Sequence, residues 1–136
     1  MTDRSILENT VKDFYEARAE RDLERTMSFV HPECCFRIAG TDKLAPFTQT
    51  VRTRPSINEA ASALFEAWDL KGLRTVEAFI DGNVVVAHRA GSVIHRPTGE
   101  SFDTEMMDKF VFKDGQVAEY LQFIDTYQVA KTAGFG

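Results

Sequence analysis

Residues 73–124 read LRTVEAFIDGNVVVAHRAGSVIHRPTGESFDTEMMDKFVFKDGQVAEYLQFI. Apolar and polar residues alternate through most of this sequence, with the period of two that is typical of β-strands. Three turn-forming segments interrupt it, Asp81-Gly82-Asn83, Arg96-Pro97-Thr98-Gly99 and Asp114-Gly115. Strands joined by such short turns pair with their neighbours in the chain, so we expect an antiparallel meander. Its four strands are predicted over 73–80, 84–95, 102–112 and 116–124.

Helical periodicity marks the chain before residue 73. Apolar residues recur there every three or four positions, which gives a helix one apolar face, and this pattern covers 6–19, 23–30 and 57–68. Asp22 and Ser56 precede the second and third of these segments and are predicted to be their N-caps. We therefore expect three helices to pack on one face of the sheet.

Shorter segments complete the predicted α+β fold. The β-compatible residues of 34–38 predict one strand between the second and third helices. The segment 41–56 has two prolines and no periodicity, which predicts a loop or a flap. Asp125 and Gly134 are predicted to begin and end a final short helix over 126–133.

The composition indicates a single globular domain over 1–136, because 43% of the residues are hydrophobic and 27% are charged. A net charge of −5 provides no basic surface, so neither nucleic acid nor a membrane is an expected partner. No apolar run approaches the ~20 residues of a membrane span, and no secretory signal is recognisable, so we expect a soluble, cytoplasmic protein. Cys34 and Cys35 are adjacent, and we expect both to be reduced.

Three short motifs carry a resemblance to a known family. They are Asp22-Leu23 at the start of the second helix, Pro97-Thr98-Gly99 in a hairpin, and Lys113-Asp114-Gly115-Gln116-Val117 before the last strand. With this order of elements the chain resembles the nuclear transport factor two-like superfamily, and most of all its ketosteroid isomerase-related, SnoaL-like polyketide cyclase branch. The resemblance implies a cone, in which a curved antiparallel sheet wraps around three N-terminal helices. It also implies a mostly apolar pocket at one end and, commonly, a homodimer.

The resemblance assigns roles to individual positions. Ketosteroid isomerases use an Asp base, and they stabilise the oxyanion with a Tyr and a protonated Asp. Alignment with them puts Ile38 at the base position, Phe14 at the Tyr position and Asp108 at the position of the protonated Asp. In the cyclase branch an acid on the last strand moves the proton, and the corresponding inward position here holds Gln122.

Asp108 is the candidate catalytic residue. Strand alternation places it on one face with Met106, Phe110 and Phe112. A carboxyl group in apolar surroundings loses hydration of its charged form, so its pKa rises and it becomes able to act as acid, base or hydrogen-bond donor. The alternative is a structural salt bridge, for which Arg18 is the obvious partner.

Two other polar residues have open roles. Arg18 continues the apolar face of the first helix, and the family alignment makes it a pocket-lining residue that would bind a carboxylate or an enolate. Alternatively, Arg18 extends to the pocket rim or neutralises Asp108. His88 is either a proton carrier in the pocket or an ordinary half-buried strand histidine, and a bend at Gly91 would change which residues of 84–95 face inward.

The predicted substrate-binding residues share a place on the expected pocket wall. They are Phe14, Arg18, Ile38, Trp68, His88, Phe110, Tyr120 and Gln122. His31, Cys34 and Cys35 do not form a plausible zinc site, because adjacent strand residues point to opposite sides and no second ligand pair follows. There is no glycine-rich phosphate loop, so we expect neither a metal nor an organic cofactor.

Two functions of different class remain open. The first is a cofactor-independent enzyme of isomerase, cyclase or hydrolase type that acts on a hydrophobic carbonyl or cyclic compound by proton transfer or enolate stabilisation. The second is a non-catalytic protein that binds such a hydrophobic ligand or a partner. In either case a homodimer is expected, because the outer face of the meander carries Met107, Val111, Leu121 and Phe123.

Overall fold

The computed structural model describes residues 4–44 and 47–134. In chain order the elements are α1 (Arg4–Ala19), α2 (Leu23–Ser28), β1 (Val30–Ile38), the 3-10 turn η1 (Asp42–Leu44), β2 (Val51–Arg52), α3 (Arg54–Ala67), β3 (Trp68–Asp69), β4 (Leu73–Asp81), β5 (Val84–His95), β6 (Ser101–Lys113), β7 (Gln116–Phe123) and α4 (Thr126–Ala133). None of the described helices is long and apolar enough to cross a membrane.

The helix starts follow from capping side chains. Asp22 caps α2 as expected, since its carboxylate accepts a hydrogen bond from the Arg25 backbone N–H at 3.0 Å. The prediction that Ser56 caps α3 was wrong, because Thr53 is the N-cap and its hydroxyl accepts from the backbone N–H of Ser56 at 3.3 Å. Pro55 lies in the first turn, where the proline ring fits and no N–H is needed, so α3 starts earlier.

The sheet combines the expected meander with one parallel pair. Strands β4 to β7 pair antiparallel in sequence, which confirms the meander, and the order along the sheet is β2-β1-β7-β6-β5-β3, with β4 also paired to β5. The strand β1 pairs with β7 in parallel, so the sheet is mixed rather than wholly antiparallel. In the chain, α3 and most of the meander lie between β1 and β7. A connection of that length is long enough to bring the two strands together in parallel.

The strand β1 is longer than the expected 34–38 because it tolerates a proline. Val30 is paired with Val117, and the register then shifts before Cys35 pairs with Glu119. Pro32 lies inside this irregular part, where a missing N–H interrupts no regular ladder.

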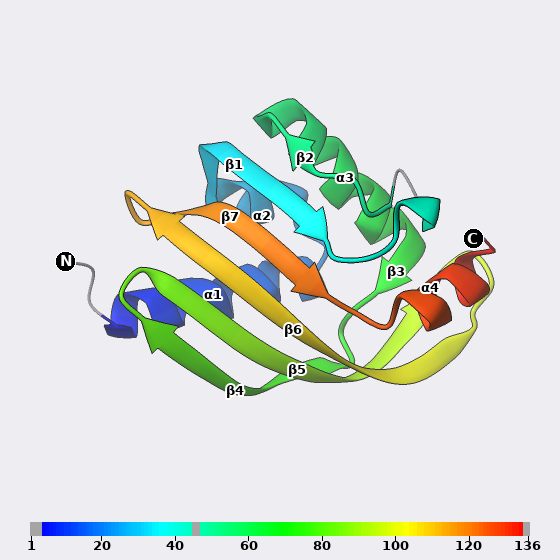
Figure 1. Cartoon of the computed structure of the whole chain (residues 1–136). Helices are drawn as coiled ribbons and strands as arrows, with labels where there is room; N and C mark the ends of the chain where they lie inside the picture. The colour runs from blue at the N-terminus through cyan, green and yellow to red at the C-terminus, as the bar shows by residue number, and fades with distance from the viewer. Residues whose placement is uncertain (1–3, 45–46, 135–136) are drawn as a thin grey trace.

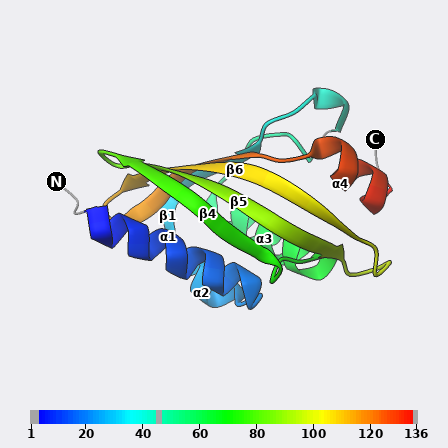
Figure 2. The same ribbon diagram turned by 90° about the horizontal axis from the view of Figure 1, so that it is seen from below.

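The sheet curls, and the three N-terminal helices lie on its concave side (Figures 1 and 2). Gly91 has φ 142°, and a Cβ there would lie 2.0 Å from the carbonyl oxygen of Gly72, so only glycine fits. The strand β4 also shifts register between Thr75 and Glu77. Despite Gly91, the inward parity of β5 does not change, because odd-numbered residues from Val85 to His95 are the more buried ones throughout.

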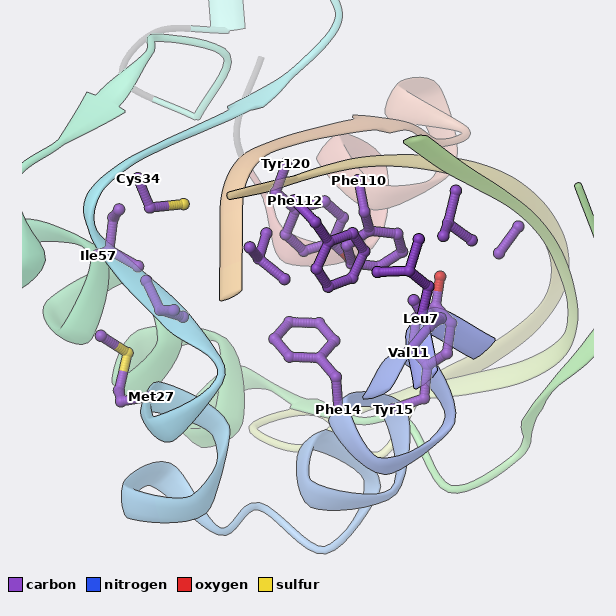
Figure 3. Packing of buried hydrophobic residues seen from close by; sticks show 14 residues of the cluster. Leu7, Val11, Phe14, Tyr15, Met27, Cys34, Ile57, Phe110, Phe112 and Tyr120 are labelled. Atoms are coloured by element: carbon purple, nitrogen blue, oxygen red, sulfur yellow. The ribbon is translucent and has the colours of Figure 1, made fainter. Parts of the chain in front are cut away.

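Aromatic rings fill the core between α1 and the sheet. The Phe14 ring points from α1 towards the rings of Phe110, Phe112 and Tyr120, as Figure 3 shows. The Phe14 centroid lies 5.6 Å from the centroids of both Phe110 and Tyr120 in edge-on contacts, and Phe110 stacks on Tyr120 at 4.6 Å. Such contacts add to the apolar burial of the rings and hold their positions.

A second apolar cluster closes the far end of the sheet. Trp68, Leu70 and Val93 form it, and Val129 and Ala133 of α4 pack against it. The cap of α4 is as expected, with Asp125 accepting from the Gln128 N–H at 3.0 Å and Gly134 ending the helix at φ 80°. The helix α4 is thereby packed against the same cluster as Leu64 and Ala67 of α3.

Candidate functional site

A cavity of about 420 Å³ lies between the helices and the concave face of the sheet, which is within the size range of small-molecule sites. Most of its wall is apolar and comes from α1, α2, α3, β1 and β7. Phe14, Met27, Cys34 and Ile57, which Figure 3 labels, belong to this wall. Its charged, hydroxyl and amide side chains are Arg18, Thr26, Tyr120 and Gln122.

Several alanines contribute to the α3 side of the cavity, beside the larger Ile57 and Phe65. Ala60, Ala61 and Ala63 line it together with Leu64, and Trp68 follows where the helix ends. An alanine side chain is a single methyl group and fills little of the space beside a helix. These alanines therefore leave room for a ligand. The cavity therefore owes much of its size to α3.

Asp108 forms the centre of a buried polar cluster next to the cavity. Its Oδ2 accepts hydrogen bonds from the hydroxyl groups of Tyr15 at 2.6 Å and Tyr120 at 3.2 Å. The residue is 0% exposed, and its Oδ1 has no hydrogen-bond partner among the described residues. Asp108 does not line the cavity itself, so a ligand there would be linked to it through wall residues that contact it, Tyr120 and Gln122.

Tyr120 joins Asp108 to two other polar residues of the cavity wall, Arg18 and Gln122. The Tyr120 hydroxyl oxygen accepts from Arg18 Nη1 at 2.5 Å and from Gln122 Nε2 at 3.0 Å. The hydroxyl proton is meanwhile donated to Asp108. The sequence left open whether Asp108 has no cationic partner or pairs directly with Arg18. In the structure neither holds, because the Tyr120 hydroxyl lies between the two and bonds to both.

Burial dominates the protonation chemistry of this cluster. It raises the pKa of Asp108, although the nearby Arg18 charge and the hydrogen bonds from Tyr15 and Tyr120 act in the opposite direction. Burial likewise raises the pKa of both tyrosines, and their nearness to Asp108 adds to this. The tyrosines are therefore neutral at physiological pH, and the guanidinium of Arg18 is charged.

Six of the nine predicted site residues line the cavity, namely Phe14, Arg18, Ile38, Trp68, Tyr120 and Gln122. Three do not. Asp108 lies behind Tyr120, and Phe110 is fully buried beneath the Tyr120 ring. His88 faces the other side of the sheet, because the odd-numbered residues of β5 point inward, and its Nε2 lies 2.9 Å from Glu105 Oε1. The expectation that His88 lines the pocket is therefore corrected.

Two residues of the cluster were missed at the level of sequence. Tyr15 donates the shorter bond to Asp108, whereas the family alignment had drawn attention to its neighbour Phe14. The sequence signal for Tyr15 was its spacing, because Leu7, Val11 and Tyr15 follow one another at intervals of four residues and so lie on the same face of α1. Arg89 lies with its guanidinium carbon 3.8 Å from the centroid of the Tyr15 ring, and no local pattern indicated this contact.

The described residues contain no group of three His, Cys, Asp or Glu side chains that would hold a metal ion. Cys34 and Cys35 are free thiols, and burial raises the pKa of Cys34 to about 12. A thiol with so high a pKa is a poor nucleophile at neutral pH. The Thr26 hydroxyl donates to the backbone carbonyl of Asp22 at 2.7 Å, so the chemistry available on the cavity wall is mainly that of Arg18, Tyr120 and Gln122.

The described residues thus form an α+β fold with a mostly apolar cavity beside a buried polar cluster. The sequence profile of the SnoaL-like domain matches residues 11–120, and the chain belongs to this family. No curated protein sequence matches the chain.

Solved structures share the fold at low sequence identity. A proposed isomerase from Bacillus subtilis superposes with a TM-score of 0.87 at 14% identity, over 100% of this chain and 98% of its own. A proposed SnoaL-like polyketide cyclase from Jannaschia gives 0.78 at 18% identity, over 96% of both chains. TerC, co-crystallised with polyporic acid, gives 0.74 at 18% identity, over 93% of this chain and 96% of its own.

Proposed function

We propose that the chain binds a hydrophobic carbonyl or cyclic compound in the cavity and acts on it as a cofactor-independent enzyme of isomerase, cyclase or hydrolase type. The observation that carries the proposal is the contrast within the cavity wall. About 420 Å³ of mostly apolar space meets polar groups at Arg18, Tyr120 and Gln122, which are joined by hydrogen bonds. An apolar ring system with one oxygen substituent matches this distribution.

Enolate stabilisation is the chemistry that these groups support. When a proton leaves the carbon next to a carbonyl, negative charge develops on the carbonyl oxygen. Arg18 is held in place by its bond to Tyr120 and by its guanidinium lying 5.6 Å from the centroid of the Phe14 ring. A fixed cation in an apolar site stabilises such charge without a cost of reorganisation.

A proton route passes through Tyr120 to Asp108. In molecules whose Asp108 is ionised, and once the substrate has displaced Gln122 from the Tyr120 oxygen, that oxygen would take the proton from the substrate carbon while its own proton moves to Oδ2 of Asp108, 3.2 Å away. One C–H bond and one O–H bond break, and two O–H bonds form. The reverse sequence returns a proton to carbon. Asp108 thus acts through Tyr120, in agreement with its burial behind the cavity wall.

Proton exchange at carbon tests the proposal. The wild-type protein is expected to accelerate deuterium incorporation next to the carbonyl group of decalone in D₂O, measured by proton NMR. Tyr120→Phe removes the hydroxyl of the route and should lower the rate about 100-fold. Tyr127→Phe is the matched control, because Tyr127 is 72% exposed on α4 and does not line the cavity, and its rate should equal that of wild type.

A second function, binding without catalysis, is favoured by one observation. The carboxylate of Asp108 is absent from the cavity wall, and the wall groups of the described chain include no ordinary base. If decalone binds by calorimetry but wild type and Tyr120→Phe exchange deuterium equally slowly, the enzyme proposal fails and the binding function replaces it. TerC, which shares this fold, has been co-crystallised with polyporic acid, and this supports a binding function for the present cavity.

We also propose a homodimer through the outer face of the sheet. Met107 is 38% exposed and Phe123 is 51% exposed there, and the two are paired across β6 and β7. Contiguous apolar surface of this kind is usually covered. Sedimentation at micromolar concentration should give twice the chain mass of 15.3 kDa, and Phe123→Glu should halve it. A species of 15.3 kDa for the wild type would contradict the proposal.

A further inference from the structure

Arg18 is a buried cation without a carboxylate partner. Its exposed fraction is 8%, although it lines the cavity. Within residues 4–44 and 47–134, no carboxylate oxygen lies within 4.0 Å of its guanidinium, and its protein hydrogen bond is the one from Nη1 to the Tyr120 hydroxyl. Buried arginines usually pair with an anion, because an unpaired charge loses its hydration without compensation.

The nearby groups do not supply that anion. Four charged or titratable side chains of the described residues act on Arg18, namely Tyr15, Arg89, Asp108 and Tyr120. Asp108 is the carboxyl group among these four. Two guanidinium groups therefore face one carboxyl group, and the cluster is positive even if Asp108 is ionised. Arg89 also lacks a carboxylate partner, since its Nη1 donates to the Thr75 hydroxyl at 2.9 Å.

The hydrogen-bond directions at the wall favour the same kind of ligand. Tyr120 donates its proton to Asp108, so this proton is not available to the cavity. Arg18 retains N–H donors that have no protein acceptor among the described residues. A guanidinium donates to a carboxylate or an enolate oxygen through short, charge-assisted bonds.

We infer that the ligand of the cavity is a hydrophobic organic monoanion whose anionic oxygen, of a carboxylate or an acidic enol, binds Arg18. This inference rests on the proposed function and narrows its substrate class from neutral ketones to acids. The apolar body of the ligand would occupy the space along α3, and its single charge would neutralise the excess positive charge of the buried cluster.

Two matched ligand pairs test the inference by calorimetry at about pH 8, where both acids are ionised. Adamantane carboxylate is compared with adamantane carboxamide, and the enolate of dimedone with neutral dimethylcyclohexanone. In at least one pair the anion should bind about 10- to 100-fold more tightly than its neutral partner, the range of a charge-assisted hydrogen bond. The pair that shows the preference identifies the carboxylate or the enolate as the recognised group.

Variants of Arg18 assign the preference to this side chain. Arg18→Gln should abolish the preference for the anion, because it lowers the affinity for the anion and leaves that for the neutral partner unchanged. Arg18→Lys keeps a positive charge and should keep part of the preference. Arg25→Gln is the matched control, since Arg25 lies on the surface of α2 and pairs with Glu16 at 3.4 Å. If Arg18→Gln does not fold, the wild-type comparison and Arg18→Lys still decide the question.

The outcomes separate this inference from the proposed function. If the neutral partners bind as tightly as both anions, or if the preference survives in Arg18→Gln, the monoanion inference is wrong while the cavity remains a site for hydrophobic cyclic compounds. If none of the four compounds binds to the wild type, both the inference and the proposed function are overturned.

Discussion

Replacing Asp108 with alanine is expected to lower the free energy of unfolding by about 3 to 5 kcal/mol. The change leaves the hydroxyl groups of Tyr15 and Tyr120 without the carboxylate oxygen that accepts both of their protons. It also removes a buried carboxyl group close to Arg18. Urea unfolding, followed by far-ultraviolet circular dichroism, measures the loss.

Asp108→Asn is the informative comparison, because the amide oxygen is able to accept from both tyrosines and keeps the shape of the side chain. Its cost at neutral pH should be below about 1 kcal/mol. A loss as large as that of alanine would show that the negative charge itself stabilises the fold, in which case Asp108 is a structural anion.

The pH dependence follows from the direction of the pKa shift. Burial raises the pKa of Asp108 in the folded state, so folding favours the protonated form. Its contribution to stability is complete below the unfolded pKa of about 3.9 and is lost as the pH rises through the folded pKa. Wild type should therefore lose stability relative to Asp108→Asn between pH 4 and neutrality. A relative gain over this interval would mean that Arg18 lowers the pKa instead.

Ala61→Phe is expected to abolish ligand binding while leaving the protein folded. Ala61 is half-buried on α3, and its methyl group lines the cavity. A phenyl ring at this position would occupy space that a ligand needs, and filling an apolar cavity commonly maintains or raises stability. Calorimetry with any compound that binds the wild type measures the affinity, and thermal unfolding measures the stability.

Glu59→Phe provides the matched control, because it adds a phenyl ring to an exposed position of the same helix outside the cavity wall. Its affinity should equal that of wild type. If Ala61→Phe retained wild-type affinity, the ligand would bind elsewhere, and the assignment of the site to this cavity would fail.

The elements of the fold were largely predictable from local pattern. Strand alternation between turns such as Asp114-Gly115 located β4 to β7 to within one or two residues, because period and turn chemistry are local properties. The partner of β1 was not predictable in this way. Pairing between β1 and β7 joins segments more than eighty residues apart, and no local signal states its direction.

The site was predictable where a residue belongs to a regular face. Periodicity placed Arg18 on the apolar face of its helix and Tyr120 with Gln122 on one strand face, the family resemblance made Arg18 and Gln122 pocket positions, and all three line the cavity. That Asp108 lies behind the cavity wall was not predictable. Strand alternation shows that its side chain points inward, but it does not show which other side chains lie between Asp108 and the cavity. Tyr120 takes that place through the register of β6 and β7, in which Phe110 is paired with Tyr120 and Asp108 with Gln122.

Trp68 gives the cavity its own optical reporter. It is the only tryptophan of the chain, it lines the cavity, and its ring lies 4.9 Å from the centroid of the His95 ring. A compound that enters the cavity replaces solvent or empty space beside the indole, which changes the wavelength and yield of its emission. Occupancy can therefore be followed by intrinsic fluorescence, without a label and in a mixture of unlabelled candidates. Because Trp68 also packs in the cluster that α4 covers, the same emission would reveal whether α4 moves when a ligand enters.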